Sequence, residues 1–154
     1  MDNQQAKTSD ISWLAGFMDG EGCFSFQPNH VRYLGKPYTF WYPRIRIDNT
    51  HIETLNDITF ILGEMGVGYN VSWRHPANVK WKTSWDIAIV GMKRVEKLLQ
   101  IISPYLKTKA EHSKRIQAWI QIRQGHKPGN QHKKYAPYSE QELQLMNEVK
   151  AMNH

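Results

Sequence analysis

The sequence predicts an α+β domain in which one helix followed by two antiparallel strands occurs twice. Two observations lead to this prediction: apolar residues switch between helical and alternating spacing along the chain, and glycine or proline stands near most of the switches. At 154 residues the chain has the length of one ordinary domain. We therefore expect a single domain over residues 1–154, with a core at about 10–123, a basic loop at 125–137 and a final helix at 139–152.

The opening helix is expected to begin at Ser9 or Asp10, because both are common N-cap residues. Gly22 fits the glycine cap with which many helices end. Between these limits, apolar residues recur at helical spacing, at Ile11, Leu14, Phe17 and Met18.

Alternating polarity predicts four strands, at 23–29, 42–48, 69–74 and 80–90. A chain break is expected at 35–37, and an apolar stripe predicts a helix at 50–63. The side chains expected on the buried side of the strands are Phe24, Phe26, Ile45, Ile47, Val71, Trp73, Trp81, Trp85, Ile87 and Ile89.

The C-terminal third of the chain predicts three more helices. Two of them are expected at 93–102 and 109–123, separated by Pro104. Ser139 and Glu142 have the spacing of a capping box that opens the last helix. The residues expected to face inward from that helix are Leu143, Met146 and Val149.

The charge balance indicates a polyanionic partner. The chain has 20 Lys and Arg against 14 Asp and Glu, a net charge of +6. The single cysteine, Cys23, excludes an internal disulfide framework and fits a reducing compartment. Neither a secretory signal nor a membrane-spanning apolar segment is present in the sequence. We expect an intracellular protein of the cytoplasm, nucleoid or an organelle that is not secreted and has no membrane partner.

The segment Leu14–Gly22 places two carboxylates, Asp19 and Glu21, at the end of a helix, where negative charge opposes the helix dipole. Gly16 and Gly20 lie one turn apart on another face, which favours close approach of a second helix. Three interpretations stay open at this point: a glycine-capped helix end, a self-associating helix, or an acidic site where two such helices end. The third would give the carboxylates a divalent cation as partner.

This segment resembles the signature motif of the LAGLIDADG homing endonucleases, with Glu21 in place of the motif's second aspartate. The resemblance implies an αββαββα fold, with C-terminal helices added, whose four-stranded antiparallel sheet is saddle-shaped and lies on DNA. It also implies a homodimer, because the motif occurs once and the motif helices of such proteins pack along a two-fold axis. The residues expected at the dimer interface are Trp13, Gly16, Phe17 and Gly20.

The resemblance also implies roles for individual residues. The metal is expected at Glu21 and Gly20, with Mg²⁺ as the cofactor and Mn²⁺ as a substitute, while Asp19 holds the helix end through bonds to backbone groups. Asn49 matches a residue that organises water, with Thr50 as its rival. Lys109 matches a basic residue near the scissile phosphates, with Lys107 second. Glu21, Lys109 and Asn49 are thus the expected catalytic residues.

The polar side of the predicted sheet is rich in cations, amides and hydroxyl groups, which are the groups that contact bases and phosphates in a major groove. A merely solvated sheet face, with lysines protecting its edges, is the alternative. The residues expected to bind DNA are Ser25, Gln27, Asn29, Tyr42, Arg44, Arg46, Asp48, Asn70, Ser72, Arg74, Lys80, Lys82, Ser84 and Asp86.

Together with the resemblance, these observations predict a site-specific endonuclease that cuts double-stranded DNA as a homodimer at the centre of a long pseudo-palindrome. The resemblance also implies that it is intron-encoded. Two alternatives keep the fold without the chemistry. One is an RNA-binding intron maturase, for which Trp41 and Tyr42 could stack on bases. The other is a DNA-binding regulator that needs no metal.

Overall fold

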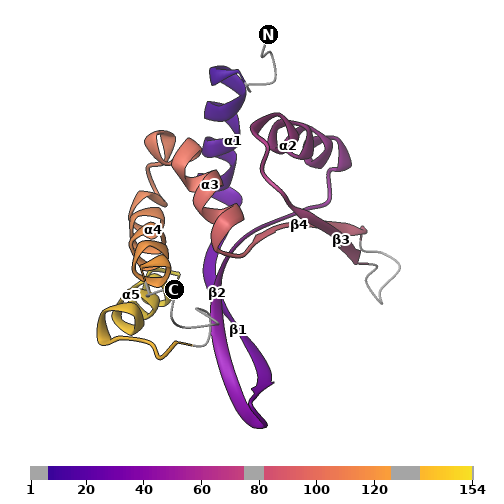
Figure 1. Cartoon of the computed structure of the whole chain (residues 1–154). Coiled ribbons are helices and arrows are strands. Elements are labelled where there is room, and N and C mark those ends of the chain that lie inside the picture. The colour runs from indigo at the N-terminus through magenta and orange to yellow at the C-terminus, as the bar shows by residue number, and fades with distance from the viewer. Residues whose placement is uncertain (1–6, 75–81, 126–135, 154) are drawn as a thin grey trace.

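The structure, a computed structural model, describes residues 7–74, 82–125 and 136–153. Figure 1 labels its helices and strands, which are numbered in the order in which they occur along the chain. They are α1 (Thr8–Glu21), β1 (Cys23–Tyr33), β2 (Lys36–Asn49), α2 (Ile52–Met65), β3 (Asn70–Arg74), β4 (Ser84–Val90), α3 (Met92–Ile102), the 3₁₀ turn η1 (Ser103–Tyr105), α4 (Ala110–Gln124) and α5 (Glu140–Met152).

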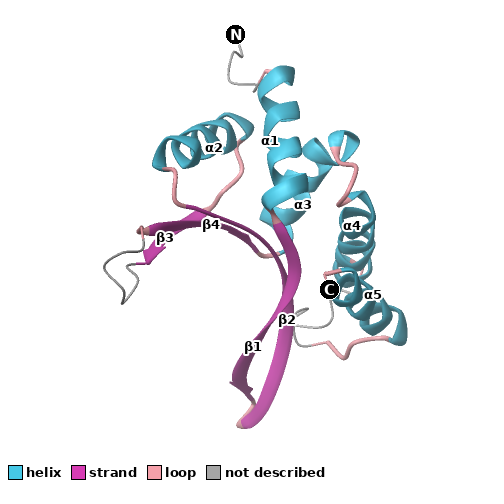
Figure 2. Ribbon diagram, turned by 180° about the vertical axis from the view of Figure 1, so that it is seen from behind, coloured by secondary structure: helices cyan, strands magenta, loops and turns pink. Residues whose placement is uncertain are grey.

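The predicted fold class is confirmed: the four strands form one antiparallel sheet in the order β1-β2-β4-β3, and helices follow it at the C-terminus. Figure 2 shows that the sheet is strongly curved, with α1, α2 and α3 on one side of it. In the part of the chain that the structure describes, the opposite side of the sheet carries no helix in either ribbon view. Period-two alternation therefore gives the sheet one buried and one open face.

The buried face of the sheet consists of side chains that the alternation predicted. Phe24, Ile45, Ile47, Ile87 and Ile89 are fully buried together with apolar residues of the helices. The outer end of this face departs from the prediction: Val71 and Trp73 are 50% and 56% exposed. Both belong to β3, an edge strand of the sheet, which is covered by less of the helical layer than its neighbour β4.

The first hairpin is longer than predicted, because the break expected at 35–37 is a two-residue turn. Leu34 and Gly35 have φ of 53° and 77°, which is the backbone sign of a type I′ turn. Tyr33 therefore pairs with Lys36, and both strands continue to the turn. The fourth strand is shorter than predicted and begins at Ser84; the predicted strand residues Lys80 and Trp81 lie outside the described residues.

The capping box at the start of α5 is confirmed, since the Ser139 hydroxyl accepts the Glu142 N–H and the Glu142 carboxylate accepts the Ser139 N–H. Met146 and Val149 are buried as expected. The expectation for Leu143 was wrong, because it is 44% exposed. Its side chain lines an open hollow at the surface of α5, next to Asn147.

The residues on either side of α5 protect free backbone edges of the first hairpin. Tyr138, just before α5, accepts the backbone N–H of Trp41 with its hydroxyl at 2.7 Å. Asn153, just after α5, donates from Nδ2 to the Phe24 carbonyl at 2.9 Å. Unpaired strand groups invite association with other chains. The C-terminal helices therefore close part of the sheet edge as well as covering the core.

No helix of the described segments is both long and apolar enough to span a membrane.

The two ends of α1 differ from the sequence prediction. The helix begins at Thr8, with Lys7 at the N-cap position, so Ser9 and Asp10 lie inside its first turn. Gly22 follows the helix with φ of −79°, outside the left-handed region that favours a glycine cap. A different constraint requires glycine here: an added Cβ would lie 2.6 Å from the Met18 carbonyl oxygen.

Replacing Gly22 with alanine is expected to destabilise the protein by about 1–3 kcal/mol, because the backbone carbonyl of Met18 cannot move without opening the end of α1. The measurement is the free energy of urea unfolding. Gly63→Ala is the matched control, since no atom lies within 4 Å of a Cβ at that helical position and alanine should be neutral or stabilising there. Equal stabilities of the two variants would contradict this account of Gly22.

Candidate DNA interface and active site

Helix α1 has one face in the core and another that is open. Leu14, Ala15 and Met18 are fully buried. On the opposite face, a Cβ added at Gly16 or Gly20 would meet no atom of the described residues within 4 Å. Trp13 is 41% exposed and its ring lies 5.5 Å from that of Phe17. Of the four residues predicted for a dimer interface, Trp13, Gly16 and Gly20 are exposed, while Phe17 beside them is partly buried against the core.

The carboxylate of Asp19 joins α1 to a segment that lies about 90 residues further along the chain. It accepts the backbone N–H groups of Lys107, Thr108 and Lys109, with shortest distances of 3.2, 2.9 and 2.7 Å. These groups precede α4, where N–H groups have no partner within the helix. Asp19 thus holds backbone groups, as the resemblance implied.

The same contact fixes the charge of Asp19. Burial alone would raise its pKa, but hydrogen bonds from the backbone N–H groups of Lys109, Thr108 and Lys107 favour the carboxylate, and the charge of Lys109 adds to them. The pKa of Asp19 is therefore lowered from its usual value. An ionised Asp19 is the form that accepts all three N–H groups.

Lys109 returns its side chain to the same helix end, where its Nζ donates to the Asp19 carbonyl at 3.0 Å. Glu21 is the last residue of α1 and is exposed. Gly20 is exposed beside it, in a last turn whose carbonyl oxygens lack partners within the helix. A carboxylate and a backbone carbonyl are the hard oxygen ligands that Mg²⁺ prefers. The Glu21 carboxylate and the Gly20 carbonyl therefore fit the predicted Mg²⁺. One chain supplies only these two of the predicted ligands.

Asn49, the third predicted catalytic residue, is the last residue of β2. Its Oδ1 accepts the backbone N–H of His51 at 2.8 Å, while His51 itself caps α2 by accepting the Thr54 N–H. By the alternation of β2, Asn49 shares the face of Ile45 and Ile47. In the structure, the Asn49 side chain therefore binds the backbone of the turn that leads from β2 through Thr50 to α2.

The strand register places the predicted DNA-binding residues of the sheet on its open face. Ser25 pairs with Arg44, Gln27 with Tyr42 and Asp48 with Asp86, and directly opposed residues of antiparallel strands share a face. By the same register the face holds Ser25, Gln27, Asn29, Tyr42, Arg44, Arg46, Asp48, Asn70, Ser72, Arg74, Ser84 and Asp86. Lys82 is exposed just before β4, and Lys80 lies outside the described residues.

Arg46 occupies the middle of this face between two carboxylates. Its guanidinium lies 2.8 Å from Asp48 and 2.5 Å from Asp86. Burial opposes the charge of Arg46, but the two aspartates raise its pKa. Burial raises the pKa of Asp86, and although Arg46 counteracts this, the neighbouring Asp48 adds to the rise. The centre of the face is therefore an ion-pair network.

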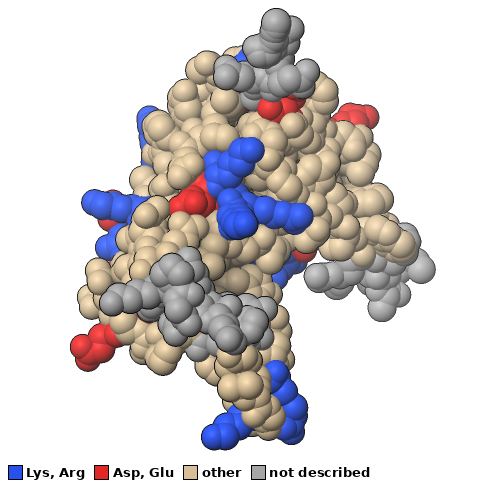
Figure 3. Space-filling view, in the orientation of Figure 1, with Lys and Arg blue, Asp and Glu red and all other residues tan. Residues whose placement is uncertain are grey.

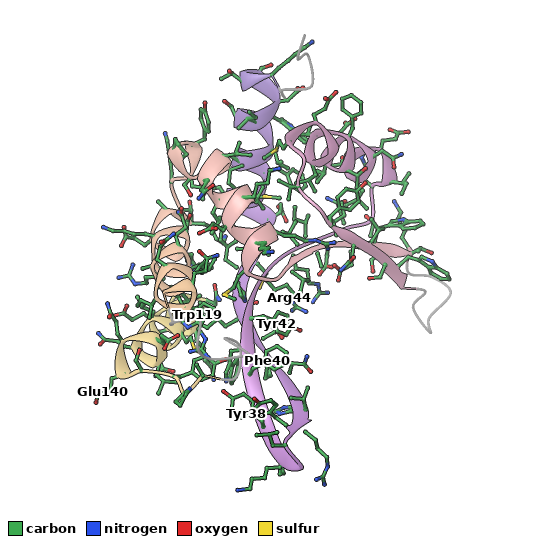
Figure 4. The ribbon with its side chains drawn as sticks, in the orientation of Figure 1. Tyr38, Phe40, Tyr42, Arg44, Trp119 and Glu140 are labelled. Carbon is green, nitrogen blue, oxygen red and sulfur yellow. The ribbon has the colours of Figure 1, made fainter. Side chains whose placement is uncertain are left out.

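Sequence reasoning missed the outer part of the open face. The register adds Val31, Tyr33, Lys36, Tyr38 and Phe40 to it, because the hairpin continues to its turn. The signal was present, since the alternation of Tyr42, Arg44 and Arg46 extends back through Phe40 and Tyr38. Figure 4 shows Tyr38, Phe40, Tyr42 and Arg44 one after another along β2. Figure 3 shows basic side chains at the free end of the hairpin.

Comparisons with known proteins give one family and one fold. The family model described as a LAGLIDADG-like domain matches residues 9–103, more than half of the chain. The structure of the homing endonuclease I-CvuI in complex with its target has a TM-score of 0.65 at 18% identity, covering 95% of this chain and 85% of that one. The intron-encoded homing endonuclease I-CeuI complexed with DNA has a TM-score of 0.65 at 12% identity, with coverages of 94% and 68%.

A longer protein also has this fold. The LAGLIDADG meganuclease I-CpaMI, bound to uncleaved DNA, has a TM-score of 0.60 at 20% identity, and the match covers 92% of this chain but 42% of that one. Comparison with curated proteins gives no match. At these identities the likeness to solved structures establishes the fold.

Asp19→Asn is expected to lower the free energy of unfolding by about 1–3 kcal/mol at pH 7, because an amide is a poorer acceptor for three N–H groups. Since the folded pKa of Asp19 is lowered, its contribution is complete above the unfolded pKa of about 3.9 and disappears as the pH falls through the folded value. Urea unfolding at several pH values should show the two proteins converging in acid. Asp57→Asn, at an exposed position of α2, is the control; a pH-independent difference for Asp19→Asn would refute the assignment.

Proposed function

Because the chain belongs to the LAGLIDADG-like domain family, we propose that it is a homing endonuclease that hydrolyses double-stranded DNA at a specific site. It acts as a homodimer with divalent metal ions, Mg²⁺ or Mn²⁺, on a long pseudo-palindromic target. We also propose that an intron encodes this protein, because the relative I-CeuI is described as group I intron-encoded.

One observation carries this proposal: the Asp19 contact brings Lys109 to the end of α1 that bears Glu21. Lys109 donates to the Asp19 carbonyl, two residues before Glu21. The first residue of the open face, Cys23, follows directly. A mere DNA-binding sheet does not require a carboxylate and an ammonium group at this edge. Metal-assisted phosphodiester hydrolysis uses metal ligands, and a cation near the phosphate stabilises the charge that develops there.

Each residue of the proposed active site has a separate role. Glu21 and the Gly20 carbonyl would hold the metal, which would supply charge neutralisation at the phosphate. Lys109 stabilises the negative charge that develops on the phosphate. Asn49 can order water beside the site only after its Oδ1 gives up the hydrogen bond from the His51 N–H. We therefore assign Asn49 a smaller contribution to catalysis than Glu21 and Lys109. Asp19 acts by positioning Lys109.

The homodimer is supported by the open face of α1 and by the scarcity of ligands in one chain. Among the described residues, no group of three or more His, Cys, Asp or Glu side chains could hold a metal ion. Two copies packed through Gly16 and Gly20 bring two Glu21 carboxylates to one axis.

The non-catalytic alternatives differ in what they require. A DNA-binding regulator uses the same face and needs neither Glu21 nor a metal. An RNA-binding maturase was expected to stack bases on Trp41 and Tyr42, but Trp41 packs against the core, so only Tyr42 remains on the open face. Tyr38 and Phe40 also lie on that face, so aromatic side chains do not separate the two partners, whereas a requirement for Glu21 and a metal does.

Glu21→Gln is expected to abolish cleavage of a selected target while leaving duplex binding in Ca²⁺ within a few-fold, because the amide keeps the shape but loses the charge that attracts the metal. Cleavage is scored as linear product from a plasmid that carries the site. Glu140→Gln, at an exposed position of α5, is the control and should cut normally. Retained cleavage by Glu21→Gln would remove Glu21 from the metal site.

Gly20→Leu is expected to convert the dimer into monomers and to abolish double-strand cleavage, because the new side chain would fill the open face of α1 where a second helix must approach. Sedimentation velocity measures the oligomeric state. Gly63→Leu introduces the same side chain at an open position of α2 and should stay dimeric. An unchanged dimer for Gly20→Leu would place the interface elsewhere.

A further inference from the structure

We propose that Phe40 and Tyr42, each with the amide residue opposite it, read A·T base pairs in the outer part of each half-site. The aromatic ring contacts the thymine methyl group and the amide contacts adenine. This inference rests on the proposed function, because it requires the open face of the sheet to lie in the major groove of a duplex.

The two aromatic rings lie on the face that carries Arg44 and Arg46. In the register, Phe40 and Tyr42 alternate with Trp41, which packs against the core from the opposite face. Their ring centroids are 6.5 Å apart, and Figure 4 shows both side chains along β2 next to Arg44. Phe40 and Tyr42 are therefore half-buried aromatic groups on the face that also carries the polar and basic side chains.

Across the hairpin, each ring is opposite an amide. Gln27 pairs with Tyr42 and Asn29 pairs with Phe40, and opposed side chains of antiparallel strands lie within contact distance of each other. In the major groove an A·T pair presents the adenine N6 and N7, which an Asn or Gln amide can contact, and the thymine methyl group, which apolar groups contact. One amide with one ring therefore complements one A·T pair.

The chemistry of the face changes along the hairpin. Near α1 it carries Arg44 and the Arg46 ion-pair network, and arginine is the usual partner of guanine. From Tyr42 outward, β2 adds the aromatic side chains of Tyr42, Phe40 and Tyr38. The Gln27 amide donates to the nearby Ser25 hydroxyl, a hydrogen bond that it can exchange for one to a base. The two amide–aromatic pairs lie four and six residues beyond Cys23, about 13 and 20 Å along the strand. These distances correspond to about four and six base pairs.

Next to Phe40 and Tyr42, the hairpin is supported by contacts with the C-terminal helices and the segment before α5. The Trp41 N–H, between the two rings, donates to Tyr138, and the ring of Phe26 lies 4.8 Å from that of Trp119. Arg123, which is buried with Glu142, lies over the Tyr138 ring at 3.9 Å. A reading surface fixed by such a supporting layer discriminates between bases better than a mobile one.

The test begins with selection of duplexes bound in Ca²⁺ from a random DNA pool. We expect A·T pairs at two outer positions of each half-site, spaced two base pairs apart. Replacing thymine by uracil at these positions removes only the methyl group, and should weaken binding by the unaltered protein roughly threefold to fivefold per methyl. The same replacement at inner positions should have no such effect.

Phe40→Ala should lose the thymine preference at one outer position and keep the salt dependence of binding, because an apolar contact releases no counterion. Lys82→Ala is the matched comparison and should reduce the salt slope by about one without changing base preference. Phe40→Leu should keep part of the preference. If Phe40→Ala fails to fold, the uracil measurement decides.

Two results would overturn the inference in distinguishable ways. An enriched duplex without A·T at the outer positions, or one insensitive to uracil, would refute the amide–aromatic assignment and leave the endonuclease proposal intact. In a parallel measurement with single-stranded DNA and RNA pools, tighter binding of a single strand than of the selected duplex would overturn both proposals, because stacked bases are then the ligand of these rings.

Discussion

The carboxylate of Asp19 is the interaction on which the rest of the molecule depends. It ties the end of α1 to the start of α4, and three backbone N–H groups at 2.7 to 3.2 Å give this contact a fixed direction. The helix end, the first strand and the basic residue Lys109 thereby become one rigid unit. A charge that is unfavourable at a helix C-terminus is offset by the N–H groups of another helix's N-terminus.

Sequence reasoning succeeded where the determining contacts are local. The alternation of β1, β2 and β4 determined both faces of the sheet, and the Ser139 capping box determined the start of α5. It failed where the environment comes from elsewhere in the chain. Whether Val71 is covered depends on how far the helical layer extends, and whether Leu143 is buried depends on where α5 docks. The polarity pattern of one segment predicts neither the extent of the helical layer nor the position at which α5 docks.

The candidate site divides in the same way. The motif contains Asp19 and Glu21, so their place at a helix end could be predicted, whereas the partners of Asp19 lie about 90 residues away. Only the resemblance pointed to Lys109. The hairpin turn at Leu34 and Gly35 concealed five residues of the open face, since glycine and proline together suggested a longer break. Nothing in the sequence around Tyr138 indicated its role, because its hydroxyl accepts the backbone N–H of Trp41 in β2, which is distant in the chain.

The position of Arg46 between Asp48 and Asp86 has a consequence for selectivity. Its guanidinium is already satisfied in the free protein, at 2.8 and 2.5 Å from two carboxylates. Any base that accepts from it must compete with these internal partners, and a base that cannot do so leaves two negative groups near the phosphates. In the proposed complex with DNA, these ion pairs would therefore oppose weak, indiscriminate binding, which the net positive charge of the chain would otherwise favour.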